Sequence, residues 1–204
     1  MFAGLSFTLK PSDALVLTGP NGSGKSSLLR ILAGLSRPAT GALCWKGRPI
    51  SEVPELYTAA VRYVGHLDAI KPALSIAETL VFWGGMAGLQ SSQVVEVTAQ
   101  AMREFGLSAL ADTPGRLLSA GQKRRVNLAR LLVGTTDLWL LDEPAIALDK
   151  VSIMALGRII AEHRARGGMV ILSTHMVVDL PHARRLDMRD FLPATRHIGE
   201  GRGP

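Results

Sequence analysis

Residues 19–26 have the pattern of a phosphate-binding loop, G-x-x-x-x-G-K-[ST], and this is the first place in the chain where chemistry can be assigned. An apolar run at 14–17 precedes the loop and leucines at helical spacing follow it, so we expect a strand, a glycine turn and a helix start. Such a turn gathers backbone N–H groups at the positive end of a helix dipole, where the phosphates of a nucleotide bind. The alternative is a glycine turn that only joins a strand to a helix. The predicted nucleotide-binding residues of this loop are Gly19, Pro20, Asn21, Gly22, Ser23, Gly24, Lys25, Ser26 and Ser27.

Lys25 and Ser26 carry the specific chemistry of the loop. The Lys25 ammonium would reach the β- and γ-phosphate oxygens, and the Ser26 hydroxyl would ligate Mg²⁺.

Two carboxylates, Asp142 and Glu143, follow four apolar residues at 138–141. A carboxylate at the end of a buried strand suits a Mg²⁺ ligand beside the phosphates, and we expect this of Asp142. Glu143 is expected to orient and deprotonate the water that attacks the γ-phosphate. An acidic pair after a strand can also cap a helix or remain solvated, so the interpretation depends on the phosphate loop.

His175 follows a further apolar run at 169–172 and could contact the γ-phosphate and sense whether it is present. A lone histidine is more often structural, but this one is expected at the end of a buried strand, which favours a catalytic role. His163, His182 and His197 have no such placement, and we expect them on the surface.

Residues 118–122 read Leu-Ser-Ala-Gly-Gln, and they allow two interpretations. Ser119 and Gln122 have the spacing of a capping box that opens a helix. A helix that starts with small residues is also an anion site, here Ser119, Ala120, Gly121 and Gln122. Because these residues end a predicted inserted lobe, we expect them to reach the phosphates of a second copy arranged head to tail about a two-fold axis.

Strands and helices alternate around these candidates. Apolar runs at 14–17, 61–64, 138–141 and 169–172 predict a parallel sheet covered on both faces, with ligands beyond the carboxyl ends of its strands. Gly65 and His66 directly follow the run at 61–64, so we expect them at that edge.

Other elements complete the predicted fold. We expect an edge strand at 2–10, a short strand at 42–45, helices at 76–86 and 91–105 in a lobe at about 72–118, and helices at 120–132 and 151–166. In the helix at 120–132, Lys123, Asn127 and Arg130 should lie on the side opposite Val126 and Ala129.

The composition fits one domain at 1–192 with a disordered tail at 193–204. The single cysteine, Cys44, excludes an internal disulfide and favours a reducing compartment. We expect neither a membrane span nor a signal peptide. The net charge is +6, but the basic residues are scattered, so we expect no nucleic-acid partner.

Residues 19–26, 118–122, 138–143 and 147–149, with His175, stand in the order and spacing of an ABC ATPase, which the chain resembles from about residue 5 to about residue 180. The resemblance implies an α/β P-loop NTPase fold with a mostly parallel core sheet, a small antiparallel β edge and an inserted helical subdomain. It implies ATP and Mg²⁺ as cofactors, with two ATP molecules sandwiched between two copies. Asp149 would belong to the loop that links the two sites, and the helical lobe would accept a membrane permease subunit.

Within that family the chain is similar to the haem exporter ATPases of cytochrome c maturation. Gly65-His66, Ile70-Lys71 and the run at 118–131 carry this likeness. It implies an ATP-hydrolysing haem translocase, peripheral on the cytoplasmic face of the bacterial inner membrane, with the permease subunits of a cytochrome c maturation complex as partners. Whether haem is transported or a haem-loaded chaperone is released stays open.

Two departures from the family pattern matter. The family has an upstream segment with an aromatic that stacks on adenine, and the chain starts too late to include it. Either the start is misplaced or truncated, or adenine is held with less stacking, for which Phe2 is a weak substitute. His66 stands where most ABC proteins have a glutamine, so its contact with Mg²⁺ is open and a role in relaying the membrane subunit's state is favoured.

Three alternative functions remain. The chain could serve another small exporter, or be an ABC protein that acts on nucleic acid, although those usually have two cassettes or a long coiled coil. A nucleotide-regulated module without turnover would need a lost catalytic residue, yet Lys25, Asp142, Glu143 and His175 are all present.

Overall fold

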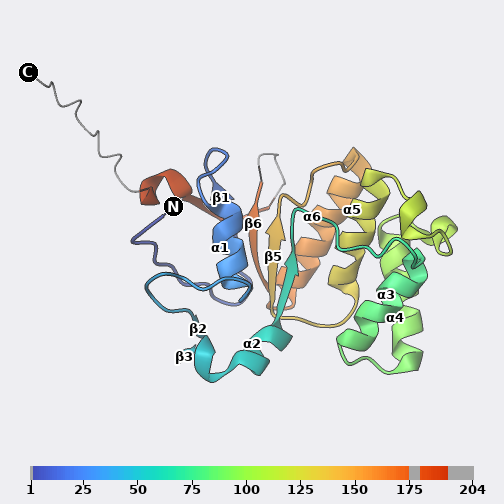
Figure 1. The fold of residues 1–204 in the computed structure, drawn as a ribbon, viewed down its shortest axis with the longest axis horizontal. Coiled ribbons are helices and arrows are strands. Elements are labelled where there is room, and N and C mark those ends of the chain that lie inside the picture. Colours follow the sequence, from blue (N-terminus) through green and yellow to red (C-terminus); the bar gives the residue numbers. More distant parts are fainter. Residues whose placement is uncertain (1, 175–179, 193–204) are drawn as a thin grey trace, which may run out of the picture.

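A five-stranded parallel sheet forms the centre of the computed structural model, which describes residues 2–174 and 180–192. The strand order is β4-β5-β6-β1-β7 (Figure 1). The strands are β1 (Ala14–Thr18), β4 (Val61–Val64), β5 (Leu138–Asp142), β6 (Met169–Ser173) and β7 (Arg184–Asp187). A separate antiparallel pair joins β2 (Cys44–Trp45) to β3 (Arg48–Pro49). The predicted parallel sheet and small antiparallel edge are confirmed.

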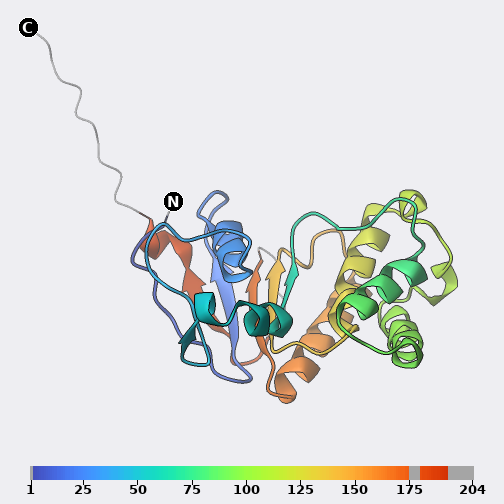
Figure 2. The same cartoon turned by 60° about the horizontal axis from the view of Figure 1, so that its bottom comes forward.

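The helices surround this sheet and form a lobe at one end of it. In Figures 1 and 2, α3, α4 and α5 gather beyond β4, at the end of the molecule away from β7. Within residues 2–174 and 180–192, no helix has the length and apolar character that crossing a membrane requires. The helices are α1 (Lys25–Leu32), α2 (Pro54–Ala60), α3 (Ile76–Met86), α4 (Ser91–Glu104), α5 (Ala120–Ala129) and α6 (Lys150–Ala165), with 3₁₀ turns at Ile50–Glu52, Ser108–Leu110, Gly115–Leu117, Arg130–Leu132 and Met188–Phe191.

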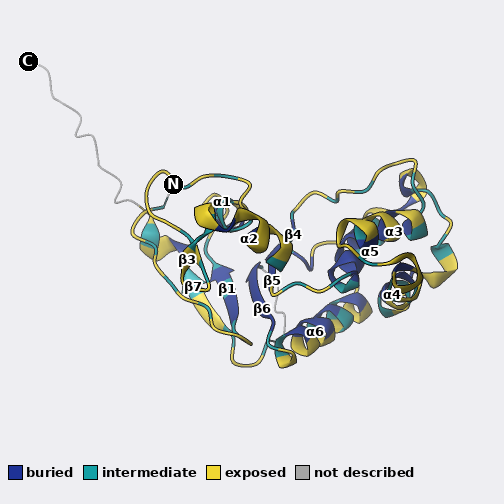
Figure 3. Ribbon diagram, turned by 90° about the horizontal axis from the view of Figure 1, so that it is seen from below, coloured by how far each residue is buried: buried dark blue, intermediate teal, exposed yellow. Residues whose placement is uncertain are grey.

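Alternating side chains of the central strands build two separate cores. In β5, Leu138 and Leu140 pack with α1 residues, whereas Trp139 and Leu141 pack with residues of α5 and α6. Figure 3 shows the result, with α1 and α2 on one face of the sheet and α6 on the other. Because both faces are covered, every residue of β5 and β6 is buried and the strands are continuously apolar up to their last residue.

The N-terminal edge strand predicted at residues 2–10 is wrong. This segment is irregular, and its alternating side chains, Leu5, Phe7 and Leu9, pack together with Phe2 against the core on the α1 side. It cannot pair beside β1, because β6 and β7 already occupy both edges of that strand. The strand predicted at 42–45 is reduced to Cys44–Trp45, while β7 and α2 were not predicted at all.

Two of the three residues predicted on the polar side of the helix at 120–132 are buried. Asn127 and Arg130 are only 3% and 7% exposed, as buried as the apolar residues on the opposite side. Asn127 donates to the Asp68 carboxylate at 2.9 Å, and Arg130 donates to the backbone carbonyl of Tyr63. Burial lowers the pKa of Arg130 to about 10, so it stays charged at neutral pH. The polar side of α5 therefore binds β4 and the loop after it.

His163 is buried, which contradicts the surface position expected for it, while His182 is exposed as predicted. The His163 ring stacks on Trp139 with 3.8 Å between ring centroids, and its Nε2 lies 3.3 Å from the carbonyl of Met169. Burial lowers the pKa of His163 below its usual value. His175, His197 and the tail predicted at 193–204 lie outside the described residues.

The buried histidine predicts a pH-dependent stability. The unfolded chain takes up a proton near pH 6.5 and the folded chain does so only at lower pH, so the free energy of unfolding should fall as pH drops below about 6.5. Replacing His163→Phe keeps an aromatic ring on Trp139 and should flatten the dependence between about pH 7.5 and pH 5.5. Denaturant unfolding across that range measures it, with exposed His182→Asn as the control. If the free energy of unfolding changes equally with pH in wild type and in His163→Phe, the assignment of this dependence to His163 is contradicted.

Candidate nucleotide-binding and hydrolysis site

The phosphate loop connects β1 directly to α1. Gly24 is the residue that precedes α1, and its φ of 97° lies in the left-handed region that favours glycine. The Lys25 ammonium bends back over the loop and donates to the carbonyls of Gly19 and Pro20 at 2.7 and 3.0 Å. Lys25 is only 7% exposed, and the buried Ser23 hydroxyl has no hydrogen-bond partner. The loop thus holds a cation and a spare hydroxyl beside a helix N-terminus, a donor set suited to phosphate oxygens.

Asp142 ends β5 and is the centre of the predicted metal site. Its Oδ1 accepts hydrogen bonds from the hydroxyls of Ser26 at 3.0 Å and Ser173 at 2.7 Å. Ser26 opens α1 and Ser173 ends β6, in register with Asp142, so three elements meet at one carboxylate oxygen. The carboxylate is 2% exposed.

A carboxylate and a hydroxyl are the hard oxygen ligands that Mg²⁺ prefers. Across residues 2–174 and 180–192 no group of three or more His, Cys, Asp or Glu residues could hold a metal by itself. Mg²⁺ at Ser26 and Asp142 would therefore complete its shell with phosphate oxygens and water, as Mg²⁺ does in nucleotide sites. His66 is exposed in the loop after β4, and its part in a metal site stays a prediction.

Glu143 occupies a sharp turn directly after β5. Its φ is 48°, a left-handed conformation unusual for a residue other than glycine. Its backbone N–H donates to the carbonyl and the hydroxyl of Ser173 at 3.1 and 3.0 Å. Sequence reasoning missed Ser173, although a small polar residue ending an apolar run was a usable signal. Ser173 thereby fixes both Asp142 and Glu143.

Ser119 and Gln122 form the predicted capping box at the start of α5. The Ser119 N–H donates to Gln122 Oε1 at 2.8 Å, and the Gln122 N–H donates to Ser119 Oγ at 3.2 Å. Ser119 and Ala120 are exposed. In Figures 1 and 3 the strands β4, β5 and β6 separate α5 from α1 and its loop, so these residues lie apart from their own chain's phosphate loop.

The loop after Glu143 contacts the start of α5. A Cβ added to Gly121 would lie 2.8 Å from the carbonyl oxygen of Ala147, closer than atoms can approach. Asp149 follows as the N-cap of α6, is exposed, and accepts a hydrogen bond from the Ser152 N–H at 2.8 Å. The hydrogen bonds from Ser152 lower the pKa of Asp149, so it is ionised at neutral pH.

Hollows formed by the described residues lie at both ends of the sheet's strands. One, of about 710 Å³, adjoins the phosphate loop at Thr18, Gly19 and Pro20 and is flanked by Arg185 and Arg189.

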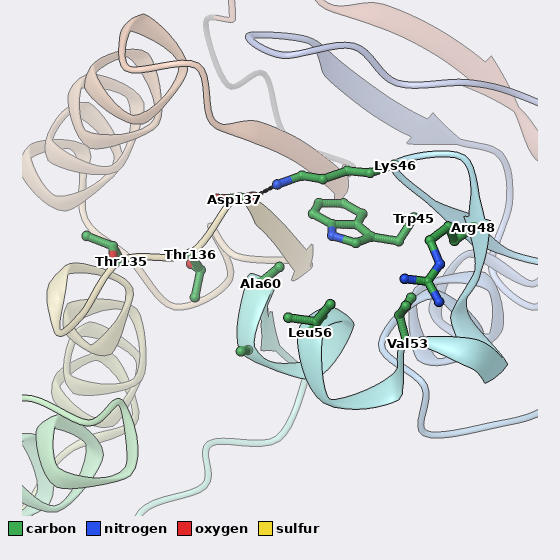
Figure 4. A pocket seen from close by; sticks show the side chains of 10 residues that line it. Trp45, Lys46, Arg48, Val53, Leu56, Ala60, Thr135, Thr136 and Asp137 are labelled. Atoms are coloured by element: carbon green, nitrogen blue, oxygen red, sulfur yellow. Dashed lines mark hydrogen bonds and ion pairs between the residues drawn. The ribbon is translucent and has the colours of Figure 1, made fainter.

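The second hollow, of about 320 Å³, lies at the amino ends of β4 and β5, beside Trp45 and Asp137 (Figure 4). Its charges pair internally, with Lys46 Nζ 3.0 Å from Asp137 Oδ2. The residues predicted to bind nucleotide lie at the other edge of the sheet.

Comparison with known proteins identifies the family. The family model described as ABC transporter matches residues 2–146. The chain belongs to the ABC transporter ATP-binding family. The predicted P-loop NTPase fold and ABC resemblance are thereby confirmed.

Curated relatives support the narrower resemblance to the ATPases of cytochrome c maturation. The chain is 54% identical to the cytochrome c biogenesis ATP-binding export protein CcmA of Paramagnetospirillum magneticum, covering 95% of this chain and 89% of the relative. It is also 54% identical to the CcmA of Rhodospirillum rubrum, covering 95% and 81%. Among solved structures, an ATP-binding subunit of an ABC transporter matches with a TM-score of 0.76 at 28% identity, covering 83% of this chain and 71% of that one.

The contact between Gly121 and Ala147 gives a testable constraint. Gly121→Ala should destabilise the fold by about 1–3 kcal/mol and lower ATP hydrolysis, because α5 or the 145–149 loop must move. Thermal unfolding and ATPase assays measure both effects. Gly85→Ala is the matched control: Gly85 is exposed in α3 with no atom within 4 Å of an added Cβ, so its replacement should not destabilise. Equal stabilities of the two variants would refute the constraint.

Proposed function

We propose that this chain is the ATP-hydrolysing subunit of a membrane ABC complex that handles haem in c-type cytochrome biogenesis. The observation that carries the proposal is the 54% identity, over 95% of the chain, to export proteins named for cytochrome c biogenesis. The convergence of the phosphate loop, Asp142 and Glu143 on one sheet edge supports the ATPase part. Haem as the exported group rests on the resemblance of the region around His66.

The residues of this edge suggest how ATP is hydrolysed. Lys25 and the N–H groups of residues 19–27 would bind the phosphates, and Ser26 and Asp142 would hold Mg²⁺, which neutralises charge on the β- and γ-phosphates. Glu143 would accept a proton from water as the water oxygen attacks the γ-phosphorus and ADP leaves. His175, which is outside the described residues, would contact the γ-phosphate.

Two copies would be needed for a complete site. The exposed start of α5, with Ser119, Ala120, Gly121 and Gln122, is separated from its own phosphate loop, and it would bind the ATP of a second copy arranged head to tail. Asp149, exposed in the neighbouring loop, would link the two sites.

The helical lobe would bind the membrane permease subunits. Large apolar side chains are exposed on it and on the loop leading to it: Leu67 is 84% exposed, Met86 69% and Phe82 43%. Exposed apolar groups of this size suit a protein partner. The complex would place this chain on the cytoplasmic face of the bacterial inner membrane, where His66 would relay the permease's state.

Variants of two residues test the hydrolytic site. Lys25→Ala should abolish ATP binding, whereas Glu143→Gln should retain binding while turnover falls by about 100-fold or more, since only the group that takes the proton is lost. Nucleotide-binding titration and phosphate release measure these effects. Glu96→Gln, an exposed carboxylate on α4, is the control and should behave as wild type. A Glu143→Gln variant that turns over normally would refute the assignment of the base.

The biological role is tested in the source organism with Glu143→Gln in place of the native residue. Membranes stained for covalently bound haem should lose all c-type cytochromes while other haem proteins remain, because export would lack its energy source. Normal c-type cytochromes would contradict the role in cytochrome biogenesis.

A further inference from the structure

Arg124 is a buried cation in the second turn of α5, outside the motifs that bind nucleotide. Arg124 as a whole is 3% exposed to solvent, and its side chain is 4% exposed. A guanidinium group is always charged and has five N–H donors, so it can be buried only where acceptors surround it. The contacts of Arg124 therefore show which parts of the site it holds.

All five N–H groups of Arg124 have acceptors, which come from two loops on neighbouring strands. One loop is the turn that contains Glu143 and the other follows β4. The bonds run from Nε to the Pro144 carbonyl (3.2 Å), from Nη1 to the Gly65 carbonyl (2.8 Å) and Asp68 Oδ1 (3.2 Å), and from Nη2 to the carbonyls of Asp142 (2.8 Å) and Glu143 (2.7 Å).

The turn at Glu143 needs such support. Glu143 is in the left-handed region at φ 48° and precedes Pro144, which restricts its backbone further. Its N–H is held by Ser173 and its carbonyl by Arg124. Ser173 and Arg124 thus hold the backbone on both sides of the Glu143 Cα. They thereby fix the direction in which the Glu143 carboxylate leaves the backbone.

The second loop connects this turn to the helical lobe. Gly65 and Asp68 flank His66 in the segment that leads from β4 towards α3. Asn127, about one turn further along α5, donates at 2.9 Å to the same Asp68 oxygen that Arg124 contacts. A displacement of α5 therefore acts on the β4 loop and on the Glu143 turn together.

We propose that Arg124 is a positioning residue that couples the location of α5 and the β4 loop to the orientation of Glu143. Hydrolysis then proceeds only when the lobe places this guanidinium correctly, whereas ATP binding by the chain's own phosphate loop, residues 19–27, does not need it, because Arg124 contacts none of these residues. The proposal rests on the proposed role of Glu143 as the base.

The test compares Arg124→Gln, Arg124→Lys and Arg125→Gln in the full chain. Arg124→Gln should lower the turnover rate by about tenfold or more while the dissociation constant for ATP stays within about twofold of wild type. Arg124→Lys should recover part of the rate, because an ammonium reaches some of the carbonyls. Arg125→Gln is the matched control, because it removes the same charge from the next residue, whose guanidinium donates to the Phe105 carbonyl in the lobe. This variant should retain the wild-type turnover rate.

The outcomes separate this proposal from the one on which it rests. A folded Arg124→Gln variant with the wild-type turnover rate, or one whose binding weakens as much as its turnover, would overturn it. If Arg124→Gln does not fold, Asp68→Asn decides: turnover lowered severalfold at unchanged ATP affinity supports the coupling, and unchanged turnover overturns it. Active Glu143→Gln would instead refute the assignment of the base itself.

Discussion

A single buried carboxylate oxygen, Oδ1 of Asp142, is the interaction on which the rest of the site depends. Burying a carboxylate costs several kcal/mol unless donors surround it. Here the hydroxyls of Ser26 and Ser173 supply those donors, from the start of α1 and the end of β6. The strands must therefore end in register, and the parallel pairing of β5 with β6 brings Asp142 opposite Ser173. The same geometry brings the phosphate loop to the carboxylate.

The second constraint is the buried polar side of α5. Arg124, Asn127 and Arg130 lie where an ordinary amphipathic helix would have apolar contacts, and each donates to β4, the loop after it or the Glu143 turn. Bonds of this kind have strict geometry, so they define a position, whereas an apolar contact tolerates sliding. The lobe is thereby attached to the part of the sheet that carries the Glu143 turn, a connection that suits an ATPase whose conformational changes are coupled to hydrolysis.

The sequence predicted most of the local structure around the candidate site, because local patterns determine it. The phosphate loop, the continuous apolar strands and the capping box at Ser119 depend on neighbouring residues, and the structure reproduces them, with α3 at Ile76–Met86 as predicted. What failed depended on distant residues. Leu5, Phe7 and Leu9 alternate as in a strand, but their side chains pack against the core on the α1 side while the segment itself stays irregular. His163 was expected on the surface, whereas it is buried and stacks on Trp139 of β5.

The most direct measurement follows Mn²⁺, as a spectroscopic substitute for Mg²⁺, bound to the chain together with ATP. Electron paramagnetic resonance should show that Asp142→Asn weakens Mn²⁺ binding by about tenfold or more, because it removes the charged ligand of the site. Asp137→Asn is the matched control, since Asp137 directly precedes the opposite end of β5 and is exposed. Wild-type Mn²⁺ affinity in Asp142→Asn would contradict the account, because the strand ends would then not converge on a metal site.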